Sequence, residues 1–165
     1  RAIAAYEGPV YLRMHRPAQP IGKDEIPLPL EIGKGQLLKD GDDAIIFAMG
    51  HMVDKAMTAS ANLSKKGLKV AVANIHTLKP LDTDFIIDHS RRSSAVVTVE
   101  NHSIIGGLGS AVAETLLEGG IAKKFKRIGV EDTFAEGGST EFLFKKYGLS
   151  SAKIEETVHT LLSND

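Results

Sequence analysis

The 165-residue sequence predicts an α/β fold, a three-layer domain built on a mostly parallel five-stranded sheet. Three observations predict it. From residue 35 onward, short apolar runs alternate with helix-like segments, which is the pattern of a parallel sheet covered by helices. The run 44–49 contains no polar residue, as in a strand covered on both faces. Gly41 and Asp42 between 35–40 and 44–49 predict an initial hairpin, which adds one antiparallel strand.

The remaining elements each have their own sequence signal. The expected strands after the hairpin are the apolar runs 70–75, 95–99 and 127–130. The expected helices begin at capping or acidic residues and end at glycine or basic residues. In chain order they are 51–66, which ends before Gly67; 81–92, with acids in its first turn and two arginines in its last; a helix opened by the glycine loop 106–109 that reaches Leu117; one capped by Ser139 and stopped by Gly148; and a last one capped by Ser150 or Ser151.

The first 34 residues depart from this alternation. Five of the six prolines lie within the first 29 residues, and proline removes backbone donors and favours extended geometry before it. Residues 17–34 are therefore expected to be a linker, and 35–165 the domain proper. Residues 1–16 combine a helix end at Gly8 with a strand at 10–14, which is too little to bury a core. We expect them to be the tail of a preceding domain and, with Arg1 in place of methionine, the chain to be a fragment.

Composition excludes several classes of function. The net charge of -1 provides no basic field for nucleic acid or an anionic membrane surface. The absence of cysteine excludes disulfides, thiolate catalysis and cysteine-ligated metals. No apolar run approaches the ~20 residues of a membrane span, and the start lacks a signal-peptide pattern. These features fit a cytoplasmic protein, which is the expected location.

Polar residues at strand ends are the first candidates for chemistry. Glu100, Asn101 and His102 follow the strand 95–99, and the carboxyl ends of parallel strands are where such sheets bind ligands. Acid–base work is one interpretation, but a hydrogen-bond cluster that braces a loop or an interface is favoured. His51 and His76 also lie at strand ends. No two histidines have the helical spacing of a metal site with an acid nearby, so no metal site is expected.

The glycine loop 106–109 does not complete a dinucleotide fingerprint, because position 112 is Val112 where a third glycine is needed. A tight turn with close packing is the favoured interpretation, although a helix start of this kind can also bind phosphate. Near the start of the chain, Arg13, His15 and Arg16 follow or end the expected strand 10–14. Their spacing alone favours solvated side chains, as it does for the basic run 123–127, which we expect to be a loop.

Longer motifs carry a resemblance. The strings VANIHTLKPLD at 72–82 and VVTVENHSIIGGLGSAVAE at 96–114 resemble the transketolase C-terminal domain, and 44–50, ending in Met-Gly, fits the same pattern. The group includes transketolases, 1-deoxyxylulose-5-phosphate synthases and the E1β chains of 2-oxoacid dehydrogenases. The resemblance covers essentially the whole chain. Within the group it is most similar to transketolases whose C-terminal half is encoded as a separate subunit.

The resemblance implies roles for both ends of the chain. Residues 1–16 are similar to the end of the family's pyrimidine-binding domain, where transketolases carry an arginine that binds the substrate phosphate; Arg16 has that position. The family's complete enzyme uses thiamine diphosphate and Mg²⁺, held by a Gly-Asp-Gly loop that this sequence lacks. We therefore expect no catalytic, cofactor or metal residue in this chain, no cofactor bound by it alone, and an inactive fragment. The resemblance assigns no role to Glu100, Asn101 or His102.

The first hypothesis is thus the C-terminal part of a transketolase, a transferase of the pentose phosphate pathway that moves a two-carbon ketol unit between sugar phosphates. Its expected partners are the rest of the enzyme, a sugar phosphate substrate and a second copy, with 106–109 as the candidate dimer contact and neither nucleic acid nor membrane involved. The first alternative is the C-terminal domain of a 1-deoxyxylulose-5-phosphate synthase or an E1β chain. A non-enzymatic interaction or regulatory module is the second.

Overall fold

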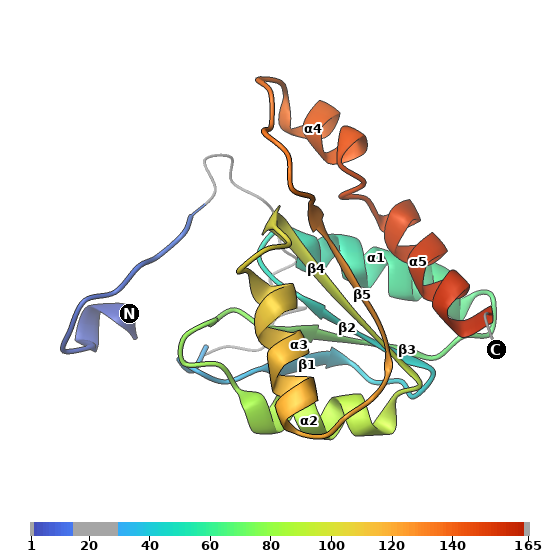
Figure 1. Ribbon diagram of the computed structural model, residues 1–165, viewed down its shortest axis with the longest axis horizontal. Helices are drawn as coiled ribbons and strands as arrows, with labels where there is room; N and C mark the ends of the chain where they lie inside the picture. Colours follow the sequence, from blue (N-terminus) through green and yellow to red (C-terminus); the bar gives the residue numbers. More distant parts are fainter. Residues whose placement is uncertain (1, 15–29, 164–165) are drawn as a thin grey trace.

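A five-stranded sheet with helices on both faces forms the domain, in a computed structural model that describes residues 2–14 and 30–163 (Figure 1). The elements in chain order are η1 (Ile3–Ala5), β1 (Gln36–Lys39), β2 (Ala44–Ala48), α1 (Met52–Ser64), β3 (Val70–Asn74), α2 (Thr83–Arg92), β4 (Ala95–Ser103), α3 (Leu108–Glu118), β5 (Lys124–Val130), α4 (Thr140–Lys146) and α5 (Ser151–Ser163). The predicted fold class is confirmed.

The sheet is mostly parallel and has the strand order β1-β3-β2-β4-β5. β2 pairs in parallel with β3 and β4, β4 pairs in parallel with β5, and β1 pairs antiparallel with β3. The antiparallel strand is as predicted, but its partner is not, because β1 and β2 do not form a hairpin. The turn between them packs instead on the entry to β3, where the Asp43 carboxylate accepts a hydrogen bond from Lys69 N at 2.6 Å. β3 thereby takes the place beside β1.

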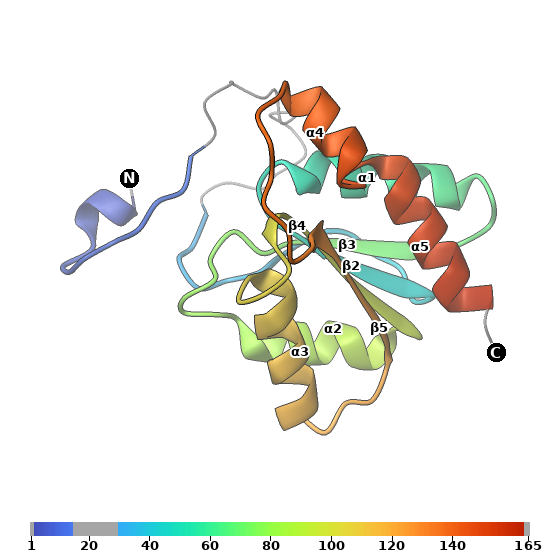
Figure 2. The same cartoon turned by 45° about the horizontal axis from the view of Figure 1, so that its top comes forward.

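Two hydrophobic clusters occupy the two faces of the sheet. α1 and α5 cover one face, and α2 and α3 cover the other (Figure 2). Every residue of β2 and β3 is buried, which explains why these strands contain no polar alternation apart from the terminal Asn74. Successive side chains point to opposite faces, so Ile45 belongs to one cluster and Ile46 to the other.

Three helices begin at their predicted capping residues. Asp82 accepts a hydrogen bond from Phe85 N and caps α2, and Ser139 accepts one from Phe142 N and caps α4. Ser150 accepts a hydrogen bond from Lys153 N at the start of α5. These caps satisfy amide groups that the first turn of a helix leaves without intrahelical partners.

The basic run is the clearest error in the predicted elements. Residues 124–127 belong to β5, an edge strand, and not to a loop. Lys124 and Lys126 are exposed, whereas Phe125 between them packs on the α2–α3 cluster. Lysines on an edge strand discourage pairing with another chain, which accounts for a strand of this composition.

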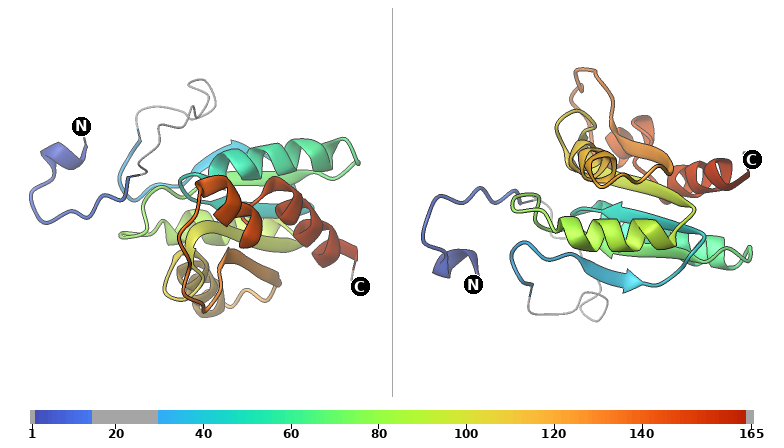
Figure 3. Two further views of the ribbon diagram at one scale, coloured as in Figure 1. Left: turned by 90° about the horizontal axis from the view of Figure 1, so that it is seen from above. Right: turned by 60° about the horizontal axis from the view of Figure 1, so that its bottom comes forward.

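The N-terminal segment, residues 2–14, lies beside the domain and contributes little to it (Figure 3). Its expected helix end is a single 3-10 turn, Ile3–Ala5, and the structure assigns no strand to 10–14. A strand needs a neighbour for its hydrogen bonds, and none pairs with this segment among the described residues. Among those residues, no helix has the length and apolar character that crossing a bilayer requires.

Candidate functional site

The carboxyl ends of β2 and β4 form the place in this sheet where a ligand would be expected. The chain passes from β2 through α1 to β3 on one side, then through α2 to β4 on the other side of β2. Open α/β sheets bind ligands at such a reversal of strand order. His51 follows β2 at this edge, and the terminal part of β4 contains Glu100, Asn101 and His102.

The carboxylate of Glu100 lies at this end of the sheet and caps α3. Glu100 is only 2% exposed, its Oε2 accepts a hydrogen bond from Leu108 N at 2.8 Å, and its Oε1 accepts one from Gly109 N at 2.8 Å. These are amides of the first turn of α3, which have no intrahelical partner. A negative charge at a helix N-terminus is also favoured by the helix dipole. The group that satisfies this helix start is therefore a side chain of the protein, where the sequence had left room for a phosphate.

Two glycines make this approach feasible. A Cβ at Gly107 would lie 1.9 Å from Glu100 Oε2, and a Cβ at Gly109 would lie 2.7 Å from the Arg127 side chain and 2.8 Å from Thr98 Oγ1. Glycine is needed here for close packing and not for a nucleotide. The tight-turn interpretation of 106–109 is confirmed, and so is the loop-bracing interpretation of Glu100.

Arg127 in β5 braces the same turn from the outside. Its Nη1 donates to Ile104 O at 2.8 Å and lies 3.4 Å from Ser110 Oγ, and Ser110 Oγ also donates to Ile104 O at 3.1 Å. Ser110 Oγ accepts a hydrogen bond from Gly106 N at 3.0 Å. The turn is thus held from β4, β5 and α3 together, and Arg127 was missed as a functional residue because only the fold brings β5 next to the turn.

The outer side of the turn is exposed. His102 and Ile105 point their side chains to solvent, with Ile105 57% exposed, and His102 Nδ1 lies 3.0 Å from Ser103 O. Asn101 O accepts a hydrogen bond from Arg13 Nη2 at 3.1 Å, which brings the N-terminal segment to the end of β4. Arg16, the predicted phosphate ligand, lies outside the described residues, as does His15.

The two other candidate histidines lie in separate places, His51 buried and His76 partly buried. His51 is 4% exposed, stands at the start of α1, and packs edge-on against Phe144 of α4 with ring centroids 5.9 Å apart. His76 follows β3, and its Nδ1 lies 2.8 Å from Thr77 Oγ1. Burial lowers the pKa of His76 below its usual value. Among the described residues, no group of three or more His, Asp or Glu side chains could hold a metal ion.

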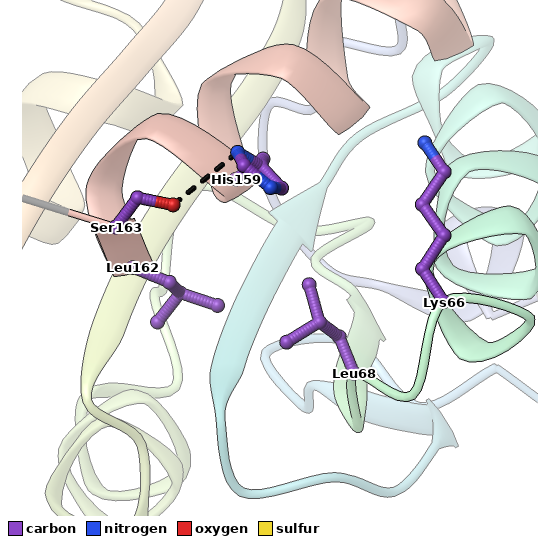
Figure 4. Close-up of a pocket in the computed structure, with 5 residues that line it drawn as sticks. All are labelled: Lys66, Leu68, His159, Leu162 and Ser163. Carbon is purple, nitrogen blue, oxygen red and sulfur yellow. Dashed lines mark hydrogen bonds between the residues drawn. The ribbon is translucent and has the colours of Figure 1, made fainter.

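Two pockets lie at the opposite end of the sheet, where the parallel strands begin. One, of about 240 Å³, lies between the chain before β3 and the end of α5, as the five lining side chains in Figure 4 show. The other, of about 310 Å³, is lined by residues around the turn 40–42 together with Lys39, Ser64, Lys69 and Arg92. Both are at the amino ends of the parallel strands, the edge where α/β sheets do not carry their ligands.

Comparison with known proteins is consistent with this geometry. Residues 33–154 match the family model "Transketolase, C-terminal domain". A "Putative transketolase C-terminal section" of Methanocaldococcus jannaschii is 42% identical over 159 residues, which cover 96% of this chain and 49% of that protein. A 6-deoxy-6-sulfo-D-fructose transketolase subunit of Clostridium sp. is 42% identical over 95% of this chain and 48% of that protein.

Relatives extend to a second enzyme class. The 1-deoxy-D-xylulose-5-phosphate synthase of Syntrophotalea carbinolica is 41% identical over 97% of this chain and 25% of its own length. Among solved structures, "Split gene transketolase, inactive beta4 tetramer" has a TM-score of 0.76 and 40% identity, and the match covers 82% of this chain and 44% of that one.

The matches identify a family and cover only part of each relative. The chain spans about half the length of the transketolase-like curated relatives that it matches, and about a quarter of the synthase. The matched region includes all five strands of the sheet and the turn that Glu100 braces. The chain belongs to the transketolase C-terminal domain family.

Proposed function

We propose that this chain is the C-terminal part of a transketolase, which transfers a two-carbon ketol unit between sugar phosphates. The observation that carries the proposal is the 42% identity, over 96% of the chain, to a protein named a transketolase C-terminal section. The fold of a split-gene transketolase, at a TM-score of 0.76 and 40% identity, supports it.

The interior of the site supports an assembly role for this domain. In an open α/β sheet the switch point is the natural place for a ligand, and here the amides at the start of the neighbouring helix α3 are already bonded to the carboxylate of Glu100. Chemistry in the complete enzyme then belongs to the other domains, and this domain contributes a rigid surface.

Thiamine diphosphate with Mg²⁺ is the cofactor we propose for the complete enzyme. Its diphosphate and metal need carboxylates and a free cradle of amides, and the described residues do not offer that set. They contain no cluster of metal-ligating side chains, and the amides at the start of α3 are already bonded to Glu100. The cofactor would therefore be held by parts of the enzyme that precede this domain.

The assembly test uses the complete coding sequence that contains these residues, together with any separate subunit. With thiamine diphosphate and Mg²⁺, the complete protein should transfer a ketol unit from a ketose phosphate to an aldose phosphate. Residues 1–165 alone should give no turnover. Turnover by the pure 165-residue chain would contradict the assembly role, and no turnover by the complete protein would contradict the transketolase assignment.

Arg16 is the residue that we propose contacts the substrate phosphate. A guanidinium binds phosphate through a two-pronged pair of hydrogen bonds, and loss of such a contact weakens binding by about tenfold or more. In the complete enzyme, Arg16→Ala should raise KM for phosphorylated sugars by that factor and leave KM for unphosphorylated sugars nearly unchanged. Arg91→Ala, at an exposed arginine of α2, is the matched control. An equal effect on both classes of sugar would remove the assigned role.

Association is the remaining part of the proposal. The partners are the preceding domains or subunit and a second copy of the chain, with the β4–α3 turn as the contact. Gly107, Leu108 and Gly109 are already buried within this domain, so the exposed Ile105 and Gly106 are the part available to a partner. Sedimentation of the complete protein as a strict monomer would contradict this.

A 1-deoxyxylulose-5-phosphate synthase is the second candidate, because a synthase is 41% identical over 97% of the chain. The two reactions differ in the donor. A synthase decarboxylates pyruvate and joins the two-carbon fragment to glyceraldehyde 3-phosphate, whereas a transketolase releases an aldose phosphate from a ketose phosphate. Measuring carbon dioxide release from pyruvate against aldose phosphate release from the same complete protein separates them.

A further inference from the structure

The α4 arm, residues 131–148, presents an aromatic side chain that the domain leaves uncovered. Every residue of 131–142 is exposed, and Phe134 is fully so. The arm nevertheless has a defined shape, because Ser139 caps α4 and Glu136 accepts hydrogen bonds from Lys146 and Tyr147. A phenyl ring in this position has its whole area still to bury, which makes it an anchor for contact with another protein.

The part of the arm around this ring is acidic. Residues 131–142 contain Glu131, Asp132, Glu136 and Glu141 and neither lysine nor arginine. Of these carboxylates, Glu136 is already paired with Lys146 of the same arm. A surface that receives Phe134 should therefore be apolar at its centre and basic at its rim.

The pocket between the chain before β3 and the end of α5 has an apolar centre of suitable size. Its volume is about 240 Å³, and an apolar cavity of about 150 Å³ is enough to bind benzene. Leu68 and Leu162 supply the apolar part and point toward each other in Figure 4. The pocket is thus large enough for one phenyl ring and small for a drug-sized ligand.

The rim of this pocket is basic. Residues 65–69 contain three exposed lysines, of which Lys66 lines the pocket together with His159 of α5. Lys66 Nζ lies 3.5 Å from Glu155 Oε2, so one carboxylate stands against three ammonium groups. The charge of the rim is opposite to that of the arm around Phe134.

The arm and the pocket lie at opposite ends of the domain. The arm follows β5 at the carboxyl ends of the parallel strands, whereas the pocket lies where those strands begin. Figure 1 shows α4 at the top and the last turn of α5, which lines the pocket, beside the C-terminus. Phe134 therefore cannot enter the pocket of its own chain, and a second copy has to supply the complementary surface.

We propose that Phe134 of one copy enters the Leu68–Leu162 pocket of a second copy, with the acids of the arm beside the lysines at the rim. The occupant follows from charge and size, since this chain contains both halves of the contact. One ring and a few exposed charges form a small interface, so the association is weak and weakens further as salt is added. It uses different surfaces from the β4–α3 contact proposed above and does not depend on ketol transfer.

Disulfide trapping tests the contact in the 165-residue chain, whose domain contains its own two hydrophobic clusters. The sequence has no cysteine, so Ala135→Cys beside Phe134 and Ser163→Cys at the pocket, both at exposed positions, can be placed in separate chains and mixed. A disulfide joins only cysteines whose Cα atoms come within about 7 Å. The mixed pair should give several times more cross-linked heterodimer than Leu117→Cys with Ser163→Cys, a control at another exposed side chain.

Adding Phe134→Ser to the Ala135→Cys chain should reduce the yield to that of the control. A yield from the original pair no higher than that of the control would overturn the proposal.

Sedimentation with charge variants tests the receiving surface. His159→Glu places a carboxylate at the rim, whereas Thr160→Glu makes the same change of charge at the next exposed residue of α5, which does not line the pocket. The sedimentation coefficient of wild type and of Thr160→Glu should rise with concentration up to about 1 mM, and that of His159→Glu and Phe134→Ser should rise much less. Self-association that His159→Glu leaves unchanged would overturn the pocket as the receiving surface. Absence of ketol transfer by the complete protein would refute the proposed function and leave these results as they are.

Discussion

Two segments that follow neighbouring strands of the sheet are held in opposite ways. The β4–α3 turn, residues 100–110, is bonded from inside by the buried Glu100 and from β5 by Arg127. The α4 arm, residues 131–148, is exposed over 131–142, with Phe134 fully exposed. This exposed part is held by surface contacts, in which Glu136 accepts hydrogen bonds from Lys146 Nζ and Tyr147 Oη.

The two segments should differ in how far the effect of a substitution extends through the domain. Contacts in the β4–α3 turn are part of the core, so their loss must lower the free energy of unfolding of the whole domain. The hydrogen bonds of Glu136 link residues at most 11 positions apart and are exposed, so their loss should stay local, whereas Phe144 and Tyr147 pack on the α1–α5 cluster. Each substitution below tests one side of this contrast.

Removal of the Glu100 carboxylate should have the largest effect. Glu100→Ala leaves two amides, Leu108 N–H and Gly109 N–H, buried without an acceptor. Each such loss costs about 1–3 kcal/mol, so the free energy of unfolding in urea should fall by about 2–5 kcal/mol. For Glu100→Gln, which keeps one acceptor oxygen, the free energy of unfolding should fall by about half as much.

The matched control for Glu100 is on the helix that it caps. Glu114→Gln in α3 makes the same chemical change at an exposed position and should stay within about 0.5 kcal/mol of wild type. If Glu100→Ala were as mild as Glu114→Gln, the turn would not be tied to the core as described.

Adjacent glycines give the second test. Gly107→Ala places a Cβ 1.9 Å from Glu100 Oε2, which must move, and about 2–4 kcal/mol of stability should be lost. Gly106 has φ +73° and no atom within 4 Å of a Cβ, so Gly106→Ala should cost only the backbone strain, about 1 kcal/mol.

A double-mutant cycle sharpens this second test. Gly107→Ala and Glu100→Ala disturb the same hydrogen bonds, so together they should cost clearly less than the sum of the two separate losses. The losses of stability caused by Gly106→Ala and by Glu100→Ala have independent causes, so they should be additive. Additive losses for Gly107 and Glu100 would show that the close approach between them is not what the glycine is needed for.

The sequence predicted the alternating elements well because their signals are local. The uninterrupted run at Ala44–Ala48 and the caps Asp82 and Ser139 each depend on a few neighbouring residues. The partner of β1 could not be predicted this way, since a Gly-Asp turn fits a hairpin equally well and only the α1 crossover places β3 in between.

The candidate site was predictable only in part. A glutamate at a strand end, six residues before a double-glycine turn, suggested loop bracing, but the two amides that it binds are set by the fold. The alternation of Lys124, Phe125 and Lys126 is a signal of an edge strand, although the density of charge in this run favours a loop. Arg127 and Arg13 donate hydrogen bonds to backbone carbonyls. Every residue has such a carbonyl, so the sequence does not show which one an arginine contacts.

The smallest effect is expected in the α4 arm, and it should depend on pH. Hydrogen bonds from Lys146 and then Tyr147 lower the pKa of Glu136 to about 2, from an ordinary value near 4.5. Folding depresses the pKa of Glu136. The stabilisation of the α4 arm by the Glu136 carboxylate is therefore complete above pH 4.5 and is lost as pH falls through about 2. Glu136→Gln should remove this pH dependence and speed proteolysis within 131–139 at neutral pH, with the urea midpoint hardly changed. Glu131→Gln, at an exposed position on the same arm, should do neither. A fall in the urea midpoint as large as that of Glu100→Gln would show that the Glu136 hydrogen bonds, too, are coupled to the core.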